Sequence, residues 1–138
     1  MTEPKKVMAA LEWTGGLRFT AGKPGGPRIL LDGDGAEGPS PVTALVCAAG
    51  ACSGADVASI LEKKKITLTS FHVEVGGRRA EEYPRRFLEI WLRFTLSGEG
   101  LTRTAAQRAV DLSVEKYCSV ILSLNPDIPI TTEVIIEA

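Results

Sequence analysis

Residues 46–61 read VCAAGACSGADVASIL, a run of small residues that carries two of the chain's three cysteines. Ser40 and Pro41 come shortly before this run. A serine that can cap free N–H groups, followed by proline at the first helical position, predicts the start of a helix. We therefore expect a helix from Pro41 to about Lys64, some 24 residues and about 36 Å long at 1.5 Å per residue. A helix of this length is expected to cross the whole domain as its central element.

Gly50 and Gly54 flank Cys52 inside this predicted helix. Each glycine costs up to about 1 kcal/mol relative to alanine in a helix interior, which indicates close approach by another backbone or a substrate. Cys47 lies five residues before Cys52, so the two thiols point to different helix faces and cannot both serve one site. A cysteine in such a helix is ordinarily a small packing residue, and both packing and chemistry remain open for Cys52. Asp56, one turn further, disfavours a thiolate at Cys52, so a reactive Cys52 needs a nearby cation.

The rest of the chain predicts further strands and one more long helix. Alternating apolar and polar residues predict six strands: Val7–Leu11, Leu17–Ala21, Arg28–Leu31, Thr67–Val75, Arg86–Ser97 and Ile130–Glu137. Gly76 and Gly77 are expected to form a turn region after the fourth strand. A second helix is expected from Thr102, as its N-cap, to the stop at Asn125-Pro126. The order β-β-β-α-β-β-α-β indicates an α+β fold with antiparallel strands around two long central helices, in a single domain over residues 1–138.

Composition excludes several classes of function. The formal net charge of −1 removes the general attraction to phosphates on which nucleic-acid binding depends. We expect no membrane span, because no stretch approaches about 20 apolar residues, and no secretory leader. We expect a cytoplasmic protein in which an odd number of cysteines forms no structural disulfide framework.

Gly33, Gly35 and Gly38 match the nucleotide-binding pattern G-x-G-x-x-G. In that pattern the helix begins inside the motif, so that its N-terminus faces the pyrophosphate. Here Pro39 and Ser40 delay the helix until the glycines are past. We interpret the segment as a flexible loop.

Five segments together resemble a known family: GGLRF (15–19), GPSP (38–41), ACSGADV (51–57), GGRRAEEYP (76–84) and EKYCSV (115–120). Over nearly the whole chain they resemble the OsmC/Ohr family of osmotically inducible and organic hydroperoxide resistance proteins, and within it the YhfA-like branch. The resemblance implies an OsmC-like intertwined homodimer with long helices at its centre and active sites at the subunit interface.

The resemblance also implies a thiol peroxidase that reduces organic or general hydroperoxides. Cys52 matches the peroxidatic cysteine of the family and Cys118 the resolving one. A thiolate attacks the peroxide, becomes a sulfenic acid and condenses with a second thiol to a disulfide, which a dithiol reductant then reduces. No metal and no organic cofactor are expected. The alternative is a small-ligand-binding protein of the same fold in which the cysteines line a cleft without turnover.

The sequence departs from the family at the residues that stabilise the thiolate. Family peroxidases carry Gly-Gly-Arg, whereas here Leu17 intervenes and Arg18 falls one place later, and Val42 stands where the family has glutamate. The substitute candidates lie between two predicted strands, where a solvated turn is the competing interpretation: Arg78, Arg79, Glu81 and Glu82. His72, the only histidine, is predicted on a polar strand face as a solvated imidazole.

Overall fold

The computed structural model describes residues 3–137, which fold into two compact units, one ending at Leu45 and the other beginning at Val46. The predicted order of strands and helices is confirmed. The elements are β1 (Ala10–Gly15), β2 (Arg18–Gly22), β3 (Ile29–Asp32), α1 (Pro41–Lys63), β4 (Thr67–Arg79), β5 (Phe87–Glu99), α2 (Arg103–Leu112), the π-helical turn η1 (Ser113–Tyr117), the 3-10 turn η2 (Ile121–Ser123) and β6 (Ile130–Ile136). The single domain over residues 1–138 stays a prediction.

The first unit is an antiparallel sheet in the order β1-β2-β3. Its first turn contains Gly15 and Gly16, whose φ angles of 115° and 54° suit glycine. The strands begin and end within four residues of their predicted bounds, because short alternating segments do not specify their ends.

The loop after β3 folds around the carboxylate of Asp32, which is 2% exposed. The backbone N–H of Asp34 donates to this carboxylate at 2.9 Å, and that of Glu37 donates at 3.1 Å. These two bonds hold the pKa of Asp32 below its ordinary value. Gly35 supplies the positive φ, 66°, that the tight loop needs. The glycines of this segment therefore allow the loop to fold around the chain's own Asp32 carboxylate.

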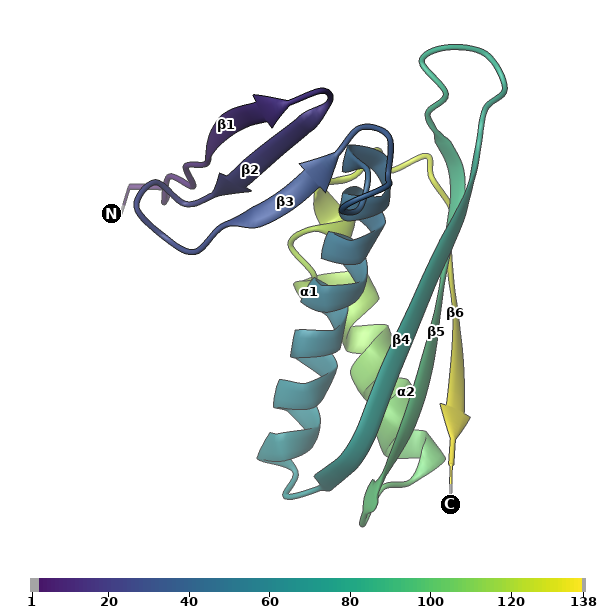
Figure 1. The fold of residues 1–138 in the computed structure, drawn as a ribbon. Helices are drawn as coiled ribbons and strands as arrows, with labels where there is room; N and C mark the ends of the chain where they lie inside the picture. The colour runs from purple at the N-terminus through teal and green to yellow at the C-terminus, as the bar shows by residue number, and fades with distance from the viewer. Residues whose placement is uncertain (1–2, 138) are drawn as a thin grey trace. The chain divides into compact units, whose positions relative to one another are not determined.

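The second unit is a two-layer arrangement in which helices cover one face of the sheet β4-β5-β6. Figure 1 shows the α1 residues from Val46 onward and α2 on the same side of this sheet. The predicted alternation in β5 is confirmed from Ile90 to Leu96, where Ile90, Leu92, Phe94 and Leu96 are buried while Trp91 and Arg93 are exposed. Leu88, predicted on the same inward face, is only half-buried. The core comprises Ala49, Val57, Leu61, Ile90, Leu92, Phe94, Leu96, Ala106, Ala109, Val110, Cys118, Ile121 and Val134.

The prediction of antiparallel pairing is wrong for one pair of strands. β4 and β5 are antiparallel, but β5 and β6 are parallel. Parallel neighbours need a long crossover between them, and the segment from α2 to residue 129 provides it.

The prediction of a turn at Gly76 and Gly77 is also wrong, because β4 continues through both residues to Arg79. A Cβ atom at Gly76 would overlap the ring of Trp91, and one at Gly77 would lie 2.7 Å from Cδ1 of Phe87. The glycines make room for aromatic side chains of the neighbouring strand β5. The chain reverses later, where the N–H of Ala80 donates to the carbonyl of Arg86.

The second long helix is shorter than predicted. Thr102 is its N-cap, as expected, and accepts a hydrogen bond from the N–H of Ala105. The α-helix ends at Leu112, and the π turn η1 follows, closed by a 2.7 Å bond from the N–H of Cys118 to the carbonyl of Ser113. Cys118 itself is extended, with ψ of 103°, so the helix stops there. A sequence pattern with helical spacing cannot reveal this change of hydrogen-bonding partner.

Helix α1 is long and apolar enough to cross a membrane by length and composition alone, with a mean hydropathy of 1.7 over its most apolar window. The expectation that no stretch approaches such a span is therefore wrong for this helix. Core helices pass the same test, and α1 buries Ala49, Gly50, Ser53, Val57 and Leu61.

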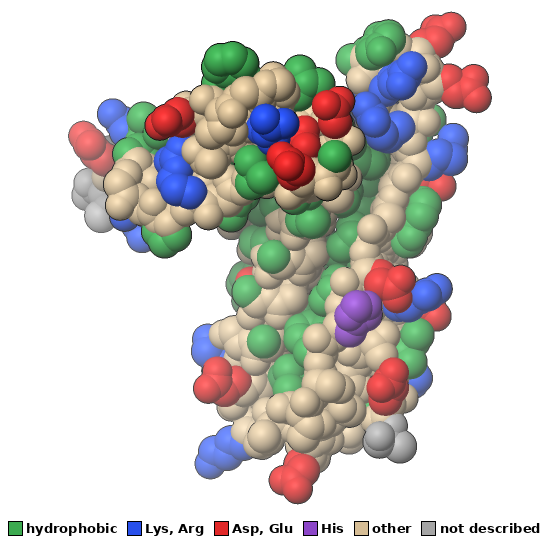
Figure 2. All heavy atoms as spheres, in the orientation of Figure 1, with side chains coloured by type: hydrophobic (Ala, Val, Ile, Leu, Met, Phe, Trp, Pro, Cys, Tyr) green, Lys and Arg blue, Asp and Glu red, His purple; other side chains and the backbone are tan. Residues whose placement is uncertain are grey.

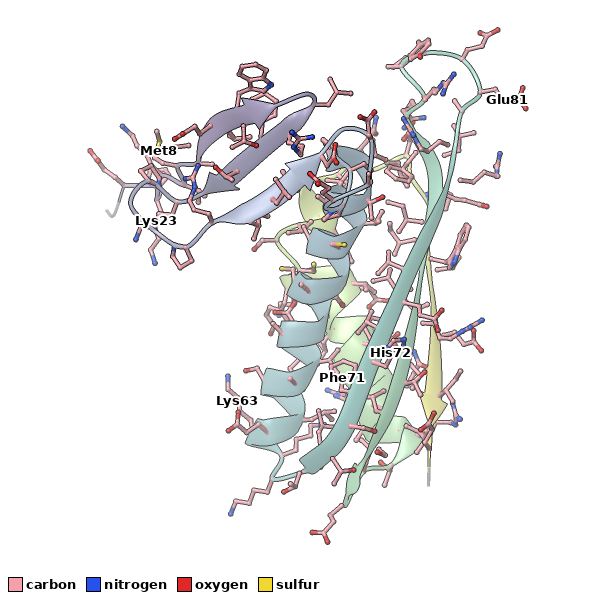
Figure 3. All side chains as sticks on the ribbon, in the orientation of Figure 1. Met8, Lys23, Lys63, Phe71, His72 and Glu81 are labelled. Carbon is pink, nitrogen blue, oxygen red and sulfur yellow. The ribbon has the colours of Figure 1, made fainter. Side chains whose placement is uncertain are left out.

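Gly50 and Gly54 of α1 face strand β4. A Cβ atom at Gly50 would lie 2.7 Å from Cγ2 of Val75, whereas one at Gly54 would lie 3.6 Å from Cγ2 of Val73. The expectation that these glycines admit a substrate or another backbone to Cys52 is wrong, because side chains of β4 occupy the space. Phe71 of β4 lies on this same helix-facing side and His72 on the other (Figure 3).

The two glycines give opposite predictions for alanine substitution. Gly50→Ala should destabilise the protein by about 1–3 kcal/mol, since the new methyl group overpacks against Val75. Gly54→Ala should stabilise it by up to about 1 kcal/mol, since the methyl group fits and helix propensity improves. Urea unfolding of both variants checks this pair, and equal effects of the same sign would contradict the packing described here.

Asp32 predicts a pH-dependent contribution to stability. Its pKa is lower in the folded protein than in the unfolded chain, so this contribution is present above about pH 4, the ordinary aspartate value. It is lost as pH falls through the folded-state pKa. Asp32→Asn should therefore be less stable than wild type near neutral pH, and the difference should shrink in acid. Denaturant midpoints measured from pH 3 to 7 test this, and a gap that widens in acid would contradict it.

Candidate functional site

Cys52 lies on α1 and is half-buried against the core of the second unit. Its neighbours Gly50 and Gly54 face β4, which leaves Cys52 on a different side of the helix. Asp56 is four residues later, one helical turn on, and therefore shares this side with Cys52. Cys47 is exposed, in agreement with the expectation that the two thiols of α1 lie on different faces.

Cys118 is reached through the π turn η1 and is fully buried. Its sulfur accepts a hydrogen bond from the backbone N–H of Ile121 at 3.4 Å. The π turn and the extended conformation at Cys118 together set the direction of this thiol. Wide turns of this kind are frequent at functional sites.

The structure brings Cys52 and Cys118 together with Asp56. The two sulfur atoms and a carboxylate oxygen of Asp56 all lie within 4.8 Å of one another. We call these three residues the thiol–carboxylate cluster. Residues 66 positions apart in the chain meet here because α1 and η1 pack in the same layer.

A hydrogen-bonded chain of side chains supports the cluster. The Ser113 hydroxyl donates to Oδ2 of Asp56 at 2.9 Å, and the hydroxyls of Ser53 and Ser113 are 2.8 Å apart. Both serines are fully buried. The chain joins α1 to the first residue of the π turn and holds the carboxylate in place beside the thiols.

The surroundings favour the neutral form of Cys118. Burial raises the pKa of its thiol, and the neighbouring Cys52 raises it further, while the N–H groups of Ile121 and Val120 lower it in part. Cys118 is therefore a protonated thiol near neutral pH. The more accessible Cys52 is better placed to meet a molecule that arrives from solvent.

The arginine candidates lie in different places. Arg78 forms a 3.3 Å ion pair with Glu89. It lies on the face of β4 opposite α1, because it alternates in step with His72 rather than with Phe71. Arg79 donates from Nε to the carbonyl of Arg85 at 2.8 Å. Of the three arginines considered for Cys52, Arg78 therefore points away from α1 within one chain.

Arg18 belongs to the first unit, where it forms a 3.3 Å ion pair with Glu37. Arg18 was one of the residues considered as stabilising a Cys52 thiolate, whereas Glu37 was not identified from the sequence. Glu81 and Glu82 are exposed in the turn after β4, and Figure 3 shows Glu81 on this turn, away from the helices.

His72 is exposed, as predicted, and lies 3.9 Å from Glu74. Figure 2 shows its side chain at the surface beside acidic and basic groups. Arg93 bridges Glu74 and Glu133 at 3.8 and 3.0 Å, so this outer sheet face is a network of ion pairs.

A groove of about 560 Å³ opens beside the cluster. Asp56 lines it together with residues of both helical segments: Ser59, Ile60, Lys63, Lys64, Leu112 and Tyr117. Asp56 therefore belongs both to the cluster and to a groove that connects it with the surface.

Sequence reasoning missed the part played by Ser53 and Ser113. It treated Asp56 only as an unfavourable neighbour of a thiolate. The spacing of Asp56 from Cys52 already placed both on one helix face. No sequence signal identified Ser113, because its position depends on how α2 packs against α1.

Comparison with known proteins gives a consistent result. Residues 33–133 match the family model described as OsmC-like protein. The chain is 43% identical over 126 residues to Protein YhfA of Escherichia coli strain K12, covering 91% of this chain and 94% of that protein. The OsmC-like protein from Mycoplasma pneumoniae has a TM-score of 0.82 at 21% identity, covering 99% of this chain and all of that one.

The organic hydroperoxide resistance protein OhrB of Bacillus subtilis has a TM-score of 0.61 at 16% identity, covering 94% of this chain and 98% of that one. At such low identity the likeness shows the fold alone. The family match and the identity to Protein YhfA carry the assignment. The chain belongs to the family of OsmC-like proteins.

Proposed function

We propose that this protein is a cysteine-based hydroperoxide reductase in which Cys52 is the peroxidatic residue and Cys118 the resolving one. The observation that carries the proposal is the meeting of these two thiols within 4.8 Å. The family includes hydroperoxide resistance proteins, of which OhrB of Bacillus subtilis is one by name. Two thiols from separate elements that converge in this way suit disulfide formation better than packing alone.

The reaction balances through these two residues. The Cys52 thiolate attacks one peroxide oxygen, the O–O bond breaks, and the released alkoxide takes a proton to leave as an alcohol. Cys52 is then a sulfenic acid. The sulfur of Cys118 attacks it, the S–O bond breaks, water leaves, and a Cys52–Cys118 disulfide forms. An external dithiol reduces this disulfide and is itself oxidised to a disulfide.

The assignment of roles follows from accessibility and charge. Cys52 is half-buried and can meet a peroxide, whereas Cys118 is fully buried. Burial raises the pKa of Cys118, so this residue stays a thiol while Cys52 reacts. Its proton is lost in the second step, when the leaving hydroxide of the sulfenic acid takes it to form water.

A thiolate at Cys52 needs positive charge, because Asp56 lies beside it. We propose that Arg18, held by Glu37, supplies this charge from a second copy of the chain. The pair would replace the arginine and glutamate of the family pattern at shifted positions. Arg78 provides a matched control, since it lies on the opposite face of β4.

The active form in this proposal is a homodimer of the cytoplasm that takes small-molecule hydroperoxides and a dithiol, and neither nucleic acid nor a membrane. Each unit leaves large apolar side chains exposed, which a second copy would cover. They are Leu11, Trp13, Leu17 and Ile29 in the first unit and Tyr117 and Leu122 in the second. α1 adds an apolar surface, since only five of its 23 residues are buried.

A second function, binding of a small ligand without turnover, is favoured by one observation. Asp56 lies within 4.8 Å of both sulfur atoms and opposes thiolate formation. The groove beside the cluster would then hold the ligand.

Substitution of single cysteines distinguishes the two functions. Cys52→Ser should abolish hydroperoxide consumption, because the nucleophile is gone. Cys118→Ser should give one turnover to a trapped sulfenic acid and then stall, because no disulfide forms. Cys47→Ser should consume hydroperoxide at the wild-type rate. Consumption is measured with an organic hydroperoxide and a panel of dithiols.

The role of Arg18 is tested by measuring the rate at which an alkylating agent modifies Cys52 in arginine variants. Arg18→Gln should slow alkylation near neutral pH by about tenfold, because loss of the positive charge should reduce the fraction of Cys52 present as thiolate by about that factor. Arg78→Gln should leave the rate unchanged. A Cys52 that reacts in wild type no faster than an ordinary thiol would reject the reductase in favour of the ligand-binding protein.

The dimer is tested separately by light scattering. We expect twice the mass of one chain at micromolar concentration. Leu122→Glu, which places a charge on the exposed apolar surface, should weaken dimer formation. Val57→Ala, a core variant, should lower the stability of the fold without a separate effect on dimer formation. A stable, folded wild-type monomer would contradict the dimer.

A further inference from the structure

The thiol–carboxylate cluster holds three groups that carry negative charge when ionised. Cys52 and Asp56 lie one turn apart on α1, and Cys118 directly follows the π turn. Their ligand atoms lie within 4.8 Å of one another. None of the ion pairs found among residues 3–137 includes Asp56. A dication at the centre of the cluster would balance its charge.

The donor set matches one class of metal. Thiolate sulfur combined with one oxygen suits Zn²⁺ and similar soft or borderline dications, and not Mg²⁺ or Ca²⁺, which take oxygen ligands. Zn–S bonds are about 2.3 Å and Zn–O bonds about 2.0–2.2 Å, so tetrahedral ligand atoms lie about 3.5–3.8 Å apart. The cluster needs to close by only about 1 Å, which rotation of cysteine and aspartate side chains can supply.

The buried serines hold the Asp56 carboxylate in a fixed orientation, as the neighbours of metal-binding carboxylates do. Ser113 donates to Oδ2 of Asp56 at 2.9 Å and is itself paired with Ser53 at 2.8 Å. Hydrogen bonds to a ligating carboxylate fix its orientation and are as important to many metal sites as the ligands themselves. Oδ1 of Asp56 has no such bond among the described residues and is free to bind a metal.

Access is provided by the groove that Asp56 lines together with Leu112 and Tyr117. A water molecule from this groove would complete four ligands. Lys63 and Lys64 line its outer part, and Figure 3 shows Lys63 near the end of α1. The lysines lie about two turns beyond Asp56, at the end of the helix, whereas Cys52 lies one turn before it.

We propose that the reduced protein binds one Zn²⁺-class ion per chain through Cys52, Asp56 and Cys118. Two S–H bonds break and two S–metal bonds form, with release of two protons to solvent and no change of oxidation state. The metal would bind the sulfur atoms of Cys52 and Cys118, the same two atoms that react in the proposed reductase chemistry. The metal therefore protects the thiols from hydroperoxide and alkylating agents, and a Cys52–Cys118 disulfide excludes the metal.

The test uses Co²⁺ and Zn²⁺ on the reduced, full-length protein. Co²⁺ should give an intense thiolate-to-metal charge-transfer band that saturates at one ion per chain, and Zn²⁺ should displace it. Cys52→Ser, Cys118→Ser and Asp56→Asn should each weaken binding by at least about 10–100-fold, the loss seen when even a supporting residue is removed. Cys47→Ser, as the matched control, should bind like wild type.

A second readout needs no variant. Zn²⁺ should slow alkylation of Cys52 and Cys118 in wild type, as located by peptide mass, and leave Cys47 as reactive as before. Absence of a thiolate-to-cobalt band, undiminished binding by Asp56→Asn, or equal protection of all three cysteines would overturn the proposal. The test requires no turnover, so a protein that binds metal without consuming hydroperoxide rejects the reductase alone, and the reverse result rejects the metal site alone.

Discussion

The buried hydrogen bond between Ser53 and Ser113 fixes the geometry on which the site depends. Both side chains are fully buried, so water cannot replace either partner. Leaving one of them unpaired costs about 1–3 kcal/mol. Because Ser53 follows Cys52 and Ser113 begins the π turn that ends before Cys118, this one bond ties the two thiol-bearing segments together. Its continuation to Asp56 sets the position of the carboxylate as well.

Charge is the second constraint on this site. A buried thiol beside another thiol and a carboxylate is stable as a neutral group, which is the condition of Cys118. A negatively charged sulfur in this cluster would lie beside the carboxylate of Asp56 and needs a cation to balance it. The proposals above differ in its source: an arginine serves peroxide chemistry, whereas a metal ion blocks it. Both follow from the same excess of negative groups, and the glycines of α1 contribute only by allowing β4 to pack closely.

The sequence predicted the parts of the fold that depend on local patterns. The start of α1 at Pro41 and the inward face of β5 follow from capping chemistry and strict alternation, and both are confirmed. The turn at Gly76 failed because a glycine pair can also accommodate an aromatic ring across a sheet. The parallel partner of β5 could not be predicted, since crossover direction depends on tertiary packing.

The site was predictable to a similar extent. Resemblance to the family selected Cys52 and Cys118, and the structure places their sulfurs together. Helical spacing placed Asp56 beside Cys52, but the sequence carries no sign that Ser113 binds it. The π turn replaces the expected α-helical bonding after Leu112, and no feature of the sequence marks this change.

The central claim is that Cys52 and Cys118 act as one redox pair. The most direct measurement is peptide mapping of the disulfide that forms when the reduced protein receives one equivalent of organic hydroperoxide, followed by rapid alkylation of the remaining thiols. The account predicts a Cys52–Cys118 disulfide within one chain, with Cys47 recovered in the alkylated form. A dominant disulfide that contains Cys47, or a Cys52 that remains fully reduced, would contradict it.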